Sequence, residues 1–209
     1  MKTRIFAFAI AVCLAAAMTT ACQWSYAASD YIVIRGERYS ISLTTMSLTN
    51  KGLQDKDLAP LQYMTNLTSL DLSNAAVGIN ENNITDLSPL SGLTDLTELR
   101  LNGLQISDLT PLSELTNLKS LWLGSNQISD ISPLSSLVNL DYLVLEANQI
   151  RDITPLTGCA NLRILTLGAN PIGDITPLAN LENLEHLYIF GIEVSDWTPV
   201  EHVPNVVGR

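Results

Sequence analysis

The sequence has few of the residues on which most enzyme sites depend. It contains 2 histidines and 3 cysteines, and no cysteine belongs to a C-x-x-C pair. It has no HExxH, GxSxG or glycine-rich phosphate-loop motif. Because neither histidine is accompanied by a nucleophile and a paired acid, the sequence predicts a protein that is not an enzyme and that binds no cofactor and no metal.

Basic residues are also scarce. Lys and Arg total 11 against 21 Asp and Glu, so the formal net charge is −10. A nucleic-acid-binding domain normally presents a basic face, and this composition therefore argues against a nucleic-acid partner. The acidic balance alone does not choose among the other classes of partner.

Long hydrophobic runs are absent except at the N-terminus. Lys2 and Arg4 precede an apolar segment at residues 5–18, and small residues follow at 25–28. This order predicts a secretory signal peptide over residues 1–27. The apolar segment is short for a membrane span. The mature chain is therefore expected outside the cell or in the cell envelope.

Two of the three cysteines lie in the predicted signal peptide, and the third lies in the body of the chain. Cys22 supports a second form of export, because bacterial lipoproteins are cleaved just before a cysteine that then carries lipid. Residues 19–21 match that motif poorly, and membrane attachment is expected only if Cys22 is lipidated. Cys159 remains alone after cleavage, which excludes an internal disulfide framework. It occupies a leucine position of the repeat described below, so we expect a buried, unreactive side chain.

The body of the sequence is a repeat of 22 residues in which leucines follow the pattern L-x-x-L-x-L-x-x-N. The recurring aspartates are Asp86, Asp108, Asp130, Asp152, Asp174 and Asp196. The recurring prolines are Pro89, Pro111, Pro133, Pro155, Pro177 and Pro199. A period in this range indicates leucine-rich repeats, which stack into a curved solenoid and bury their leucines against their neighbours.

The first half of each copy predicts a short strand followed by a turn. Leu121 and Leu123 alternate with residues that point away from the core, which is the period-two pattern of a strand. An asparagine then tolerates turn geometry and can bond neighbouring backbone groups, so stacked copies are expected to form a ladder. The ladder residues are Asn126, Asn148 and Asn170. Leu104 and Ile192 replace the asparagine, and we expect interruptions towards both ends.

The second half of each copy predicts a helical turn. A Ser or Thr directly precedes each recurring proline, as Thr154 precedes Pro155. Because Ser and Thr are good N-caps and Pro suits the first helical position, a short 3₁₀ return is expected. We expect each recurring aspartate to bond local backbone at the entry of this turn. The alternative is a row of carboxylates that binds hard cations, but each copy offers only one carboxylate.

The pattern L-x-x-L-x-x-L-x-L-x-x-N-x-I-x-D-I-x-P-L closely resembles the internalin type of bacterial leucine-rich repeat. Residues 137–156, LVNLDYLVLEANQIRDITPL, show it whole, and the resemblance extends from about residue 57 to 200. It implies an α/β solenoid of right-handed curvature, with parallel strands on the concave face and short 3₁₀ or helical turns on the convex face. It also implies an exported protein whose concave face binds another macromolecule.

The segments at the two ends of the repeats differ from the internalin pattern. Internalins begin with a helical cap, whereas residues 31–43 look strand-like, and we assign 28–56 to an N-terminal cap with a degenerate first repeat. The repeats are expected over 57–199, with a seven-residue insertion near 73–82. Residues 200–209 are expected to cover the last repeat as a C-terminal cap.

Aromatic and apolar side chains gather at the outward strand positions of the later repeats. Strand leucines face the core, so core packing does not require rings on the opposite side. An exposed apolar patch usually marks an interface, and Trp and Tyr often anchor one. The predicted ligand-binding residues are Arg100, Trp122, Tyr142, Val144, Ile164, His186, Tyr188 and Phe190. For Tyr188 and Phe190, packing against the C-terminal cap is an equal alternative.

These features predict a secreted or cell-surface binding module, monomeric, with an extracellular protein as the partner of its concave face. A second interpretation is recognition of envelope polysaccharide, because aromatic platforms also stack on sugar rings. A third is a spacer, or a truncated part of a larger surface protein. Internalins often continue into further domains and a wall anchor, whereas this sequence stops at Arg209.

Overall fold

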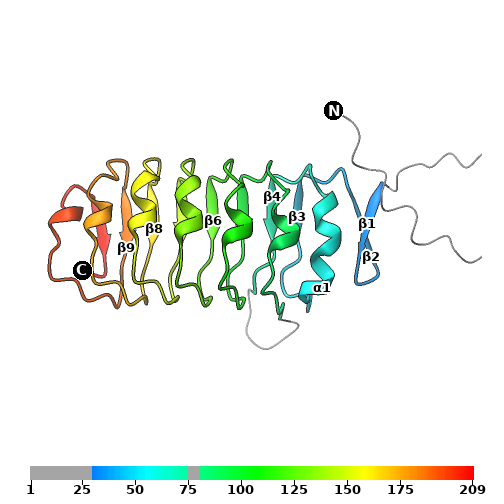
Figure 1. Ribbon diagram of the computed structural model, residues 1–209, viewed down its shortest axis with the longest axis horizontal. Helices are drawn as coiled ribbons and strands as arrows, with labels where there is room; N and C mark the ends of the chain where they lie inside the picture. Colours follow the sequence, from blue (N-terminus) through cyan, green and yellow to red (C-terminus); the bar gives the residue numbers. More distant parts are fainter. Residues whose placement is uncertain (1–29, 75–80) are drawn as a thin grey trace, which may run out of the picture.

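The computed structural model describes residues 30–74 and 81–209 of the chain (Figure 1). The predicted signal peptide, Cys22 and most of the predicted insertion lie outside the described residues. Within the described ranges, no helix combines the length and the apolar character that crossing a bilayer requires.

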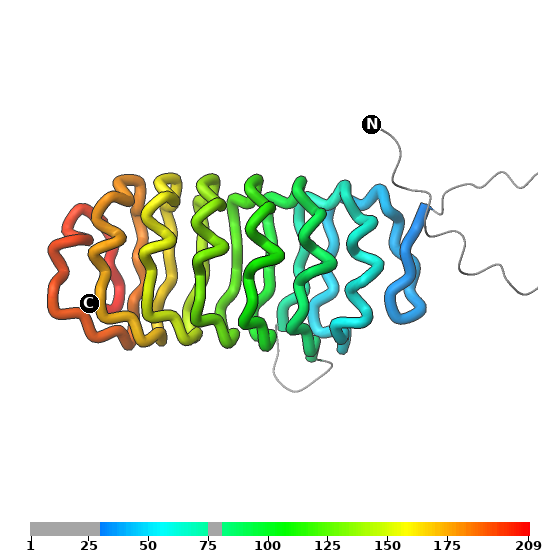
Figure 2. Tube along the Cα trace, viewed as in Figure 1, coloured from blue at the N-terminus to red at the C-terminus, as the bar shows by residue number. Residues whose placement is uncertain are grey.

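Short strands form one parallel sheet that runs the length of the molecule (Figure 1). Their spatial order follows the chain, so each repeat pairs with the repeat before it and the repeat after it. The strands are β3 (Thr45–Ser47), β4 (Ser69–Asp71), β5 (Glu98–Arg100), β6 (Ser120–Trp122), β7 (Tyr142–Val144), β8 (Ile164–Thr166), β9 (His186–Tyr188) and β10 (Asn205–Val207). Figure 2 shows the chain advancing along the long axis, one turn after another. The leucine-rich-repeat solenoid is confirmed.

The returning halves of the repeats form a second layer of short helical turns. The first return consists of α1 (Asp55–Leu58) and η1 (Ala59–Tyr63), and the later returns are 3₁₀ helices. These are η2 (Ser88–Leu90), η3 (Thr110–Leu112), η4 (Ser132–Ser136), η5 (Thr154–Gly158), η6 (Thr176–Leu178) and η7 (Thr198–Val200). The strands line the concave side of such a solenoid, and the helical turns lie on the opposite side.

Leucines from both layers fill the space between them. Leu121 and Leu143 come from strands, Leu112 and Leu134 come from helical turns, and all four are 0% exposed. Full burial of one leucine stabilises a fold by roughly 1.5–3 kcal/mol. Because every repeat contributes such residues, the stacking of repeats is the main source of stability.

A β-hairpin lies at the N-terminal end of the solenoid. β1 (Tyr31–Ile34) pairs antiparallel with β2 (Glu37–Ser40) in a sheet of its own. Ile32 and Ile34 are buried and belong to the same hydrophobic core as the leucines. The hairpin therefore covers apolar side chains of the first repeat that would otherwise face water.

Buried asparagines hold the turns that follow the strands, as predicted. The Nδ2 group of Asn148 donates to the carbonyl oxygens of Leu123 at 2.9 Å and Leu145 at 3.0 Å. Its Oδ1 accepts from the backbone N–H of Ile128 at 3.0 Å. The same three kinds of bond recur at Asn126 and Asn170. One side chain thus satisfies backbone groups of two successive repeats.

The ladder also has a member that the repeat pattern did not predict. Leu104 and Ile192 interrupt it and are buried as apolar substitutes. Beyond Leu104, however, the Nδ2 group of Asn82 donates to Leu48 at 2.9 Å and Leu72 at 2.7 Å. Residues 75–80 separate Asn82 from its strand in the sequence, which obscured its alignment with the other ladder residues.

The 3₁₀ turns are capped differently from the prediction. Thr154 is the first residue of η5 rather than its cap, and Pro155 follows it. The capping bond comes from Asp152, whose Oδ1 accepts from the Thr154 backbone N–H at 2.8 Å. Equivalent bonds recur at Asp86, Asp108, Asp130, Asp174 and Asp196. The prediction that the aspartates bond local backbone is therefore confirmed.

Cys159 is a core residue, as predicted. It is 0% exposed, and its Sγ lies 3.8 Å from the carbonyl oxygen of Leu134. Burial raises the pKa of the thiol to about 11. Because the thiolate is the reactive form, the side chain is inert at neutral pH.

Candidate functional site

The sheet face carries three columns of outward side chains. The first column, at the strand starts, is Glu98, Ser120, Tyr142, Ile164 and His186. The central column is Arg100, Trp122, Val144, Thr166 and Tyr188. The third column, just past the strand ends, is Asn102, Gly124, Glu146, Gly168 and Phe190. Parallel pairing thus brings residues 22 positions apart into contact.

A left-handed backbone turn ends the third column in each repeat. Ser125, Ala147 and Ala169 have φ values of 57°, 54° and 55°. Gly103 and Gly191 occupy the same position in the flanking repeats with φ of 69° and 72°. This conformation directs the chain away from the sheet face and towards the buried asparagine position. The turn therefore sets where the outward columns stop.

Trp122 and Tyr142 form an aromatic pair across β6 and β7. Their ring centroids are 5.1 Å apart and their planes differ by 33°. The guanidinium of Arg100 lies 4.2 Å from the centroid of the Trp122 ring. The same guanidinium makes an ion pair with Glu98 at 2.8 Å. Trp122 is therefore held by side chains from the strands on both sides.

The aromatic residues continue on β9 and just beyond it. The rings of His186 and Tyr188 are stacked, with centroids 6.4 Å apart and planes 12° apart. Tyr188 lies beside Val207 of β10 in the sheet register. Phe190 is 57% exposed, so most of this residue faces solvent instead of packing under the C-terminal segment.

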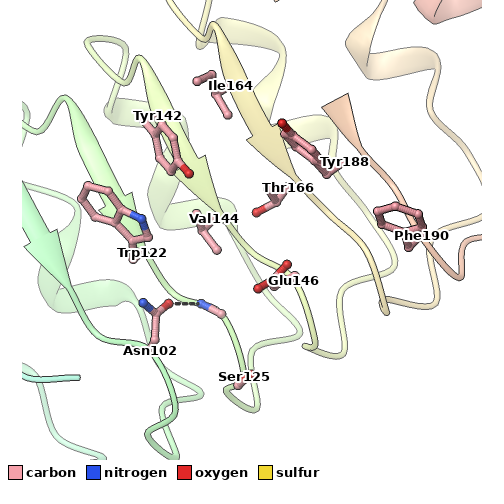
Figure 3. A pocket seen from close by; sticks show the side chains of 11 residues that line it. Asn102, Trp122, Ser125, Tyr142, Val144, Glu146, Ile164, Thr166, Tyr188 and Phe190 are labelled. Carbon is pink, nitrogen blue, oxygen red and sulfur yellow. Dashed lines mark hydrogen bonds between the residues drawn. The ribbon is translucent and has the colours of Figure 1, made fainter. Parts of the chain in front are cut away.

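A shallow cavity of about 420 Å³ lies among these columns (Figure 3). Trp122 and Tyr142 stand on one side of it, and Tyr188 and Phe190 stand on the other. Val144 is 7% exposed and forms part of its floor. The volume is in the range of small-ligand sites, although the cavity is open to solvent.

Most of the predicted binding residues line this cavity. They are Trp122, Tyr142, Val144, Ile164, Tyr188 and Phe190. Arg100 borders a neighbouring depression near β3 and β4, and His186 is not among the lining residues of the cavity. The structure thus brings six predicted residues together and places the other two outside.

Several lining residues were not among the predicted binding residues. Glu146 and Thr166 line the cavity, together with Asn102, Gly124 and Ser125. The Oδ1 atom of Asn102 accepts from the Gly124 backbone N–H at 2.9 Å, which fixes one edge (Figure 3). The prediction centred on the aromatic and apolar residues, with Arg100 and His186, and left these residues out. Glu146 and Thr166 nevertheless occupy the same outward positions of their repeats.

The described residues offer no site for a metal ion. No group of three or more His, Cys, Asp or Glu is arranged for coordination in residues 30–74 and 81–209. Each recurring aspartate instead uses one oxygen for the backbone of its own turn, as Asp174 does for Thr176 at 2.8 Å. The groups that the sheet face presents are aromatic rings, apolar surface and hydrogen-bonding side chains.

Comparison with known proteins agrees with this geometry. The sequence profile of a family described as "Leucine Rich repeats (2 copies)" matches residues 76–114 and 116–158. The crystal structure of internalin C2 from Listeria monocytogenes is 35% identical in sequence, with a TM-score of 0.62. The match covers 82% of this chain and 84% of that one. The chain belongs to the internalin family of bacterial leucine-rich repeat proteins.

Two further solved structures extend the comparison. Internalin F from the same species is 26% identical, with a TM-score of 0.57, and the match covers 82% of this chain and 63% of internalin F. A leucine-rich repeat protein of Leptospira interrogans has a TM-score of 0.68 at 21% identity. That match covers 78% of this chain and 42% of the other, and it shows a shared fold only. A comparison with curated protein sequences gave no match.

Proposed function

We propose that this internalin-type chain is an exported, non-enzymatic, monomeric module that binds an extracellular protein on its concave sheet face. The observation that carries the proposal is the cavity lined by Trp122, Tyr142, Tyr188 and Phe190. These rings stand on the face opposite the leucine core, where burial of the repeat leucines does not require them. Partly exposed Trp and Tyr are the residues that most often anchor protein interfaces.

Ring geometry favours a protein partner over a polysaccharide. A sugar ring stacks on an open, flat aromatic face. The Trp122 ring has Arg100 over it at 4.2 Å and is tilted by 33° against Tyr142. The rings stand around a shallow, open depression with an apolar floor at Val144, which suits the insertion of a side chain.

Capture from cell-envelope fractions tests the proposed function. The purified chain is incubated with intact cells and with envelope fractions, beside a Trp122→Ala/Tyr142→Ala/Tyr188→Ala variant. A Tyr63→Ala/Val138→Ala variant is the matched control, because it removes exposed apolar side chains away from the sheet face. Circular dichroism and urea unfolding confirm that every variant is folded.

We expect the native chain and the control to retain a partner that the triple variant loses. Protease treatment of the fractions should abolish the capture. Capture that survives protease and disappears after glycosidase treatment would show a polysaccharide ligand instead. Equal capture by the native chain and the triple variant would contradict a site on the sheet face.

Export is the second part of the proposal. It rests on the basic, apolar and small-residue order of residues 1–28. Mass spectrometry of the chain recovered from medium and envelope would show an N-terminus at Ala28 after signal-peptide cleavage. An N-terminal lipid on Cys22 would show anchoring in the membrane, and an uncleaved chain in the cytoplasm would contradict export.

A further inference from the structure

We propose that the cavity on the sheet face receives an arginine or lysine side chain of the partner, with Glu146 as its counter-ion. The inference rests on the proposed function, because it specifies the chemistry of the residue that enters the same cavity. Figure 3 shows Glu146 and Thr166 between the Trp122–Tyr142 pair on one side and Tyr188 on the other.

Glycines occupy the third-column positions on both sides of Glu146. Gly124 precedes it in the third column and Gly168 follows it. A Cβ atom on Gly124 would lie 3.3 Å from the Cγ atom of Glu146 and 3.2 Å from Oδ1 of Asn102. A Cβ atom on Gly168 would lie 3.0 Å from the carbonyl oxygen of Phe190. A side chain at position 124 would therefore crowd Glu146, and one at position 168 would meet Phe190.

Glu146 has no cationic neighbour in the described part of the chain. No ion pair or side-chain hydrogen bond among the described residues involves the Glu146 carboxylate. No Lys, Arg or His in the described ranges lines the cavity. Arg100, which lies beside the Trp122 ring, already forms an ion pair with Glu98 at 2.8 Å. The negative charge beside the rings is therefore available to a cation from outside.

The other lining residues suit the rest of a cationic side chain. The faces of aromatic rings attract cations, and Tyr142 and Tyr188 line the same cavity as Glu146, whereas Arg100 already lies over the Trp122 ring. Val144 offers an apolar floor to the aliphatic stem of an arginine or lysine. Thr166 also lines the cavity, and its buried Oγ1 has no hydrogen-bond partner in the described structure.

Other occupants fit this arrangement less well. An apolar side chain would remove water from an unpaired carboxylate without replacing its hydrogen bonds, which is unfavourable. An acidic side chain would meet both Glu146 and a molecule of net charge −10. A divalent cation needs several oxygen ligands, whereas the cavity offers one carboxylate. Charge complementarity therefore selects a basic side chain of the partner protein.

Nuclear magnetic resonance titration of the full chain tests this inference. The probes are N-acetyl-arginine amide and N-acetyl-lysine amide, with N-acetyl-norleucine amide as a neutral probe of similar length. The reporter is the indole N–H signal of Trp122, assigned by its loss in a Trp122→Phe variant. Glu146→Gln removes the charge and keeps the shape, and Glu182→Gln makes the same change at an exposed position outside the cavity.

We expect both cationic probes to shift the Trp122 signal saturably, and the neutral probe to bind more weakly by about tenfold or more. Glu146→Gln should remove this difference, and Glu182→Gln should leave it unchanged. Equal shifts by all probes, no shift by any probe, or full retention of the difference in Glu146→Gln would overturn the inference. Partner capture that still depends on the rings would then leave the proposed function standing. If the probes behaved as expected but partner capture did not depend on the rings, the proposed function would be wrong and the inference about the cavity would stand.

Discussion

At the scale of single residues, two kinds of asparagine support the turns in different ways. The ladder residue Asn148 is 8% exposed and bonds four backbone groups from inside the turn. A second row lies on the surface, where Asn139 donates one bond to the carbonyl oxygen of Thr116 at 2.9 Å. The same surface bond recurs at Asn66, Asn117, Asn161 and Asn183. Because the two rows differ in burial, we expect them to contribute different amounts to the stability of the fold.

Replacement of the buried asparagine should therefore be far more damaging than replacement of the exposed one. Asn148→Ala leaves the buried Ile128 N–H without a partner, while the Leu123 and Leu145 carbonyl oxygens keep one asparagine donor each, from Asn126 and Asn170. We expect a loss of about 2–4 kcal/mol in the free energy of unfolding. Asn139→Ala exposes its carbonyl partner to water and should lose about 0.5–1.5 kcal/mol. Urea unfolding followed by circular dichroism measures both. Similar losses in the two variants would contradict the assigned roles.

Two residues that are adjacent in the sequence but lie on opposite faces of β6 should also differ in how much stability is lost when each is replaced. Leu121 is 0% exposed, so Leu121→Ala should lower the free energy of unfolding by about 2–5 kcal/mol. Trp122 contacts Tyr142 and Arg100 but keeps contact with solvent, so Trp122→Ala should lose only about 1–2 kcal/mol. Chemical denaturation of the two variants gives the comparison. A larger loss for Trp122→Ala would reverse the assignment of inner and outer faces.

At the scale of elements, the 3₁₀ returns depend on ionised aspartates. Hydrogen bonds from the Thr154 side chain and backbone lower the pKa of Asp152 below its ordinary value. The corresponding threonines lower the pKa of Asp108, Asp174 and Asp196 in the same way. A carboxyl group with a lower pKa in the folded state binds its proton more readily after unfolding. These aspartates therefore stabilise the fold while they are ionised.

The sign of this linkage predicts acid sensitivity. The stabilisation is fully present above the unfolded pKa of about 3.9 and is lost as the pH falls through the lower folded pKa values. We expect urea midpoints to fall steeply below about pH 4. Asp152→Asn/Asp174→Asn should be less stable at pH 7 and should lose less on acidification. The control is Asp95→Asn/Glu114→Gln, which changes the same number of charges away from the capping bonds.

Urea unfolding at pH 7, 5, 4 and 3 measures this dependence. The control should follow the native chain in the shape of its pH profile. An Asp152→Asn/Asp174→Asn variant whose midpoint falls as steeply as the native midpoint would show that the capping carboxylates do not determine acid stability.

At the scale of the whole molecule, the solenoid has one continuous core and two ends whose apolar surface must be covered. Each repeat contacts only its neighbours, so a terminal repeat needs a cover for its apolar surface. At the C-terminal end, β10 pairs with β9. The carbonyl oxygen of Val207 in β10 accepts a hydrogen bond from the Ile189 N–H at 2.9 Å. Val203, just before β10, is 6% exposed.

Removal of this last element should weaken the fold from its end. Deletion of residues 202–209 exposes Leu187 and Ile189 of the β9 repeat, and we expect a loss of roughly 3–6 kcal/mol from two apolar side chains. Deletion of residues 208–209 leaves β10 in place and is the control. Urea midpoints and binding of an apolar dye measure the effect. Equal midpoints for the two deletions would show that β10 does not cover the core.

Prediction from the sequence succeeded where the information is local to one repeat. Leucine spacing identified the inward residues of each strand, because alternation along a strand sets the side to which a side chain points. Failures arose where an insertion or a neighbouring repeat intervened. Asn82 was missed because the extra residues before it hide its alignment, and Thr154 was assigned as a cap although Asp152 makes the capping bond.

For this internalin-type chain, the spacing of residues along the sequence was enough to predict the repeat, the solenoid, the inward leucines and the outward positions of the aromatic residues. Only the tertiary structure decided which outward residues share one cavity. Trp122 meets Tyr142 because parallel pairing places residues from adjacent repeats diagonally beside each other. The Glu146 side chain has its space because its neighbour Gly124 carries no Cβ atom, which would lie 3.3 Å from the Cγ atom of Glu146. Such contacts depend on register and side-chain direction across repeats, which the pattern within a single repeat does not contain.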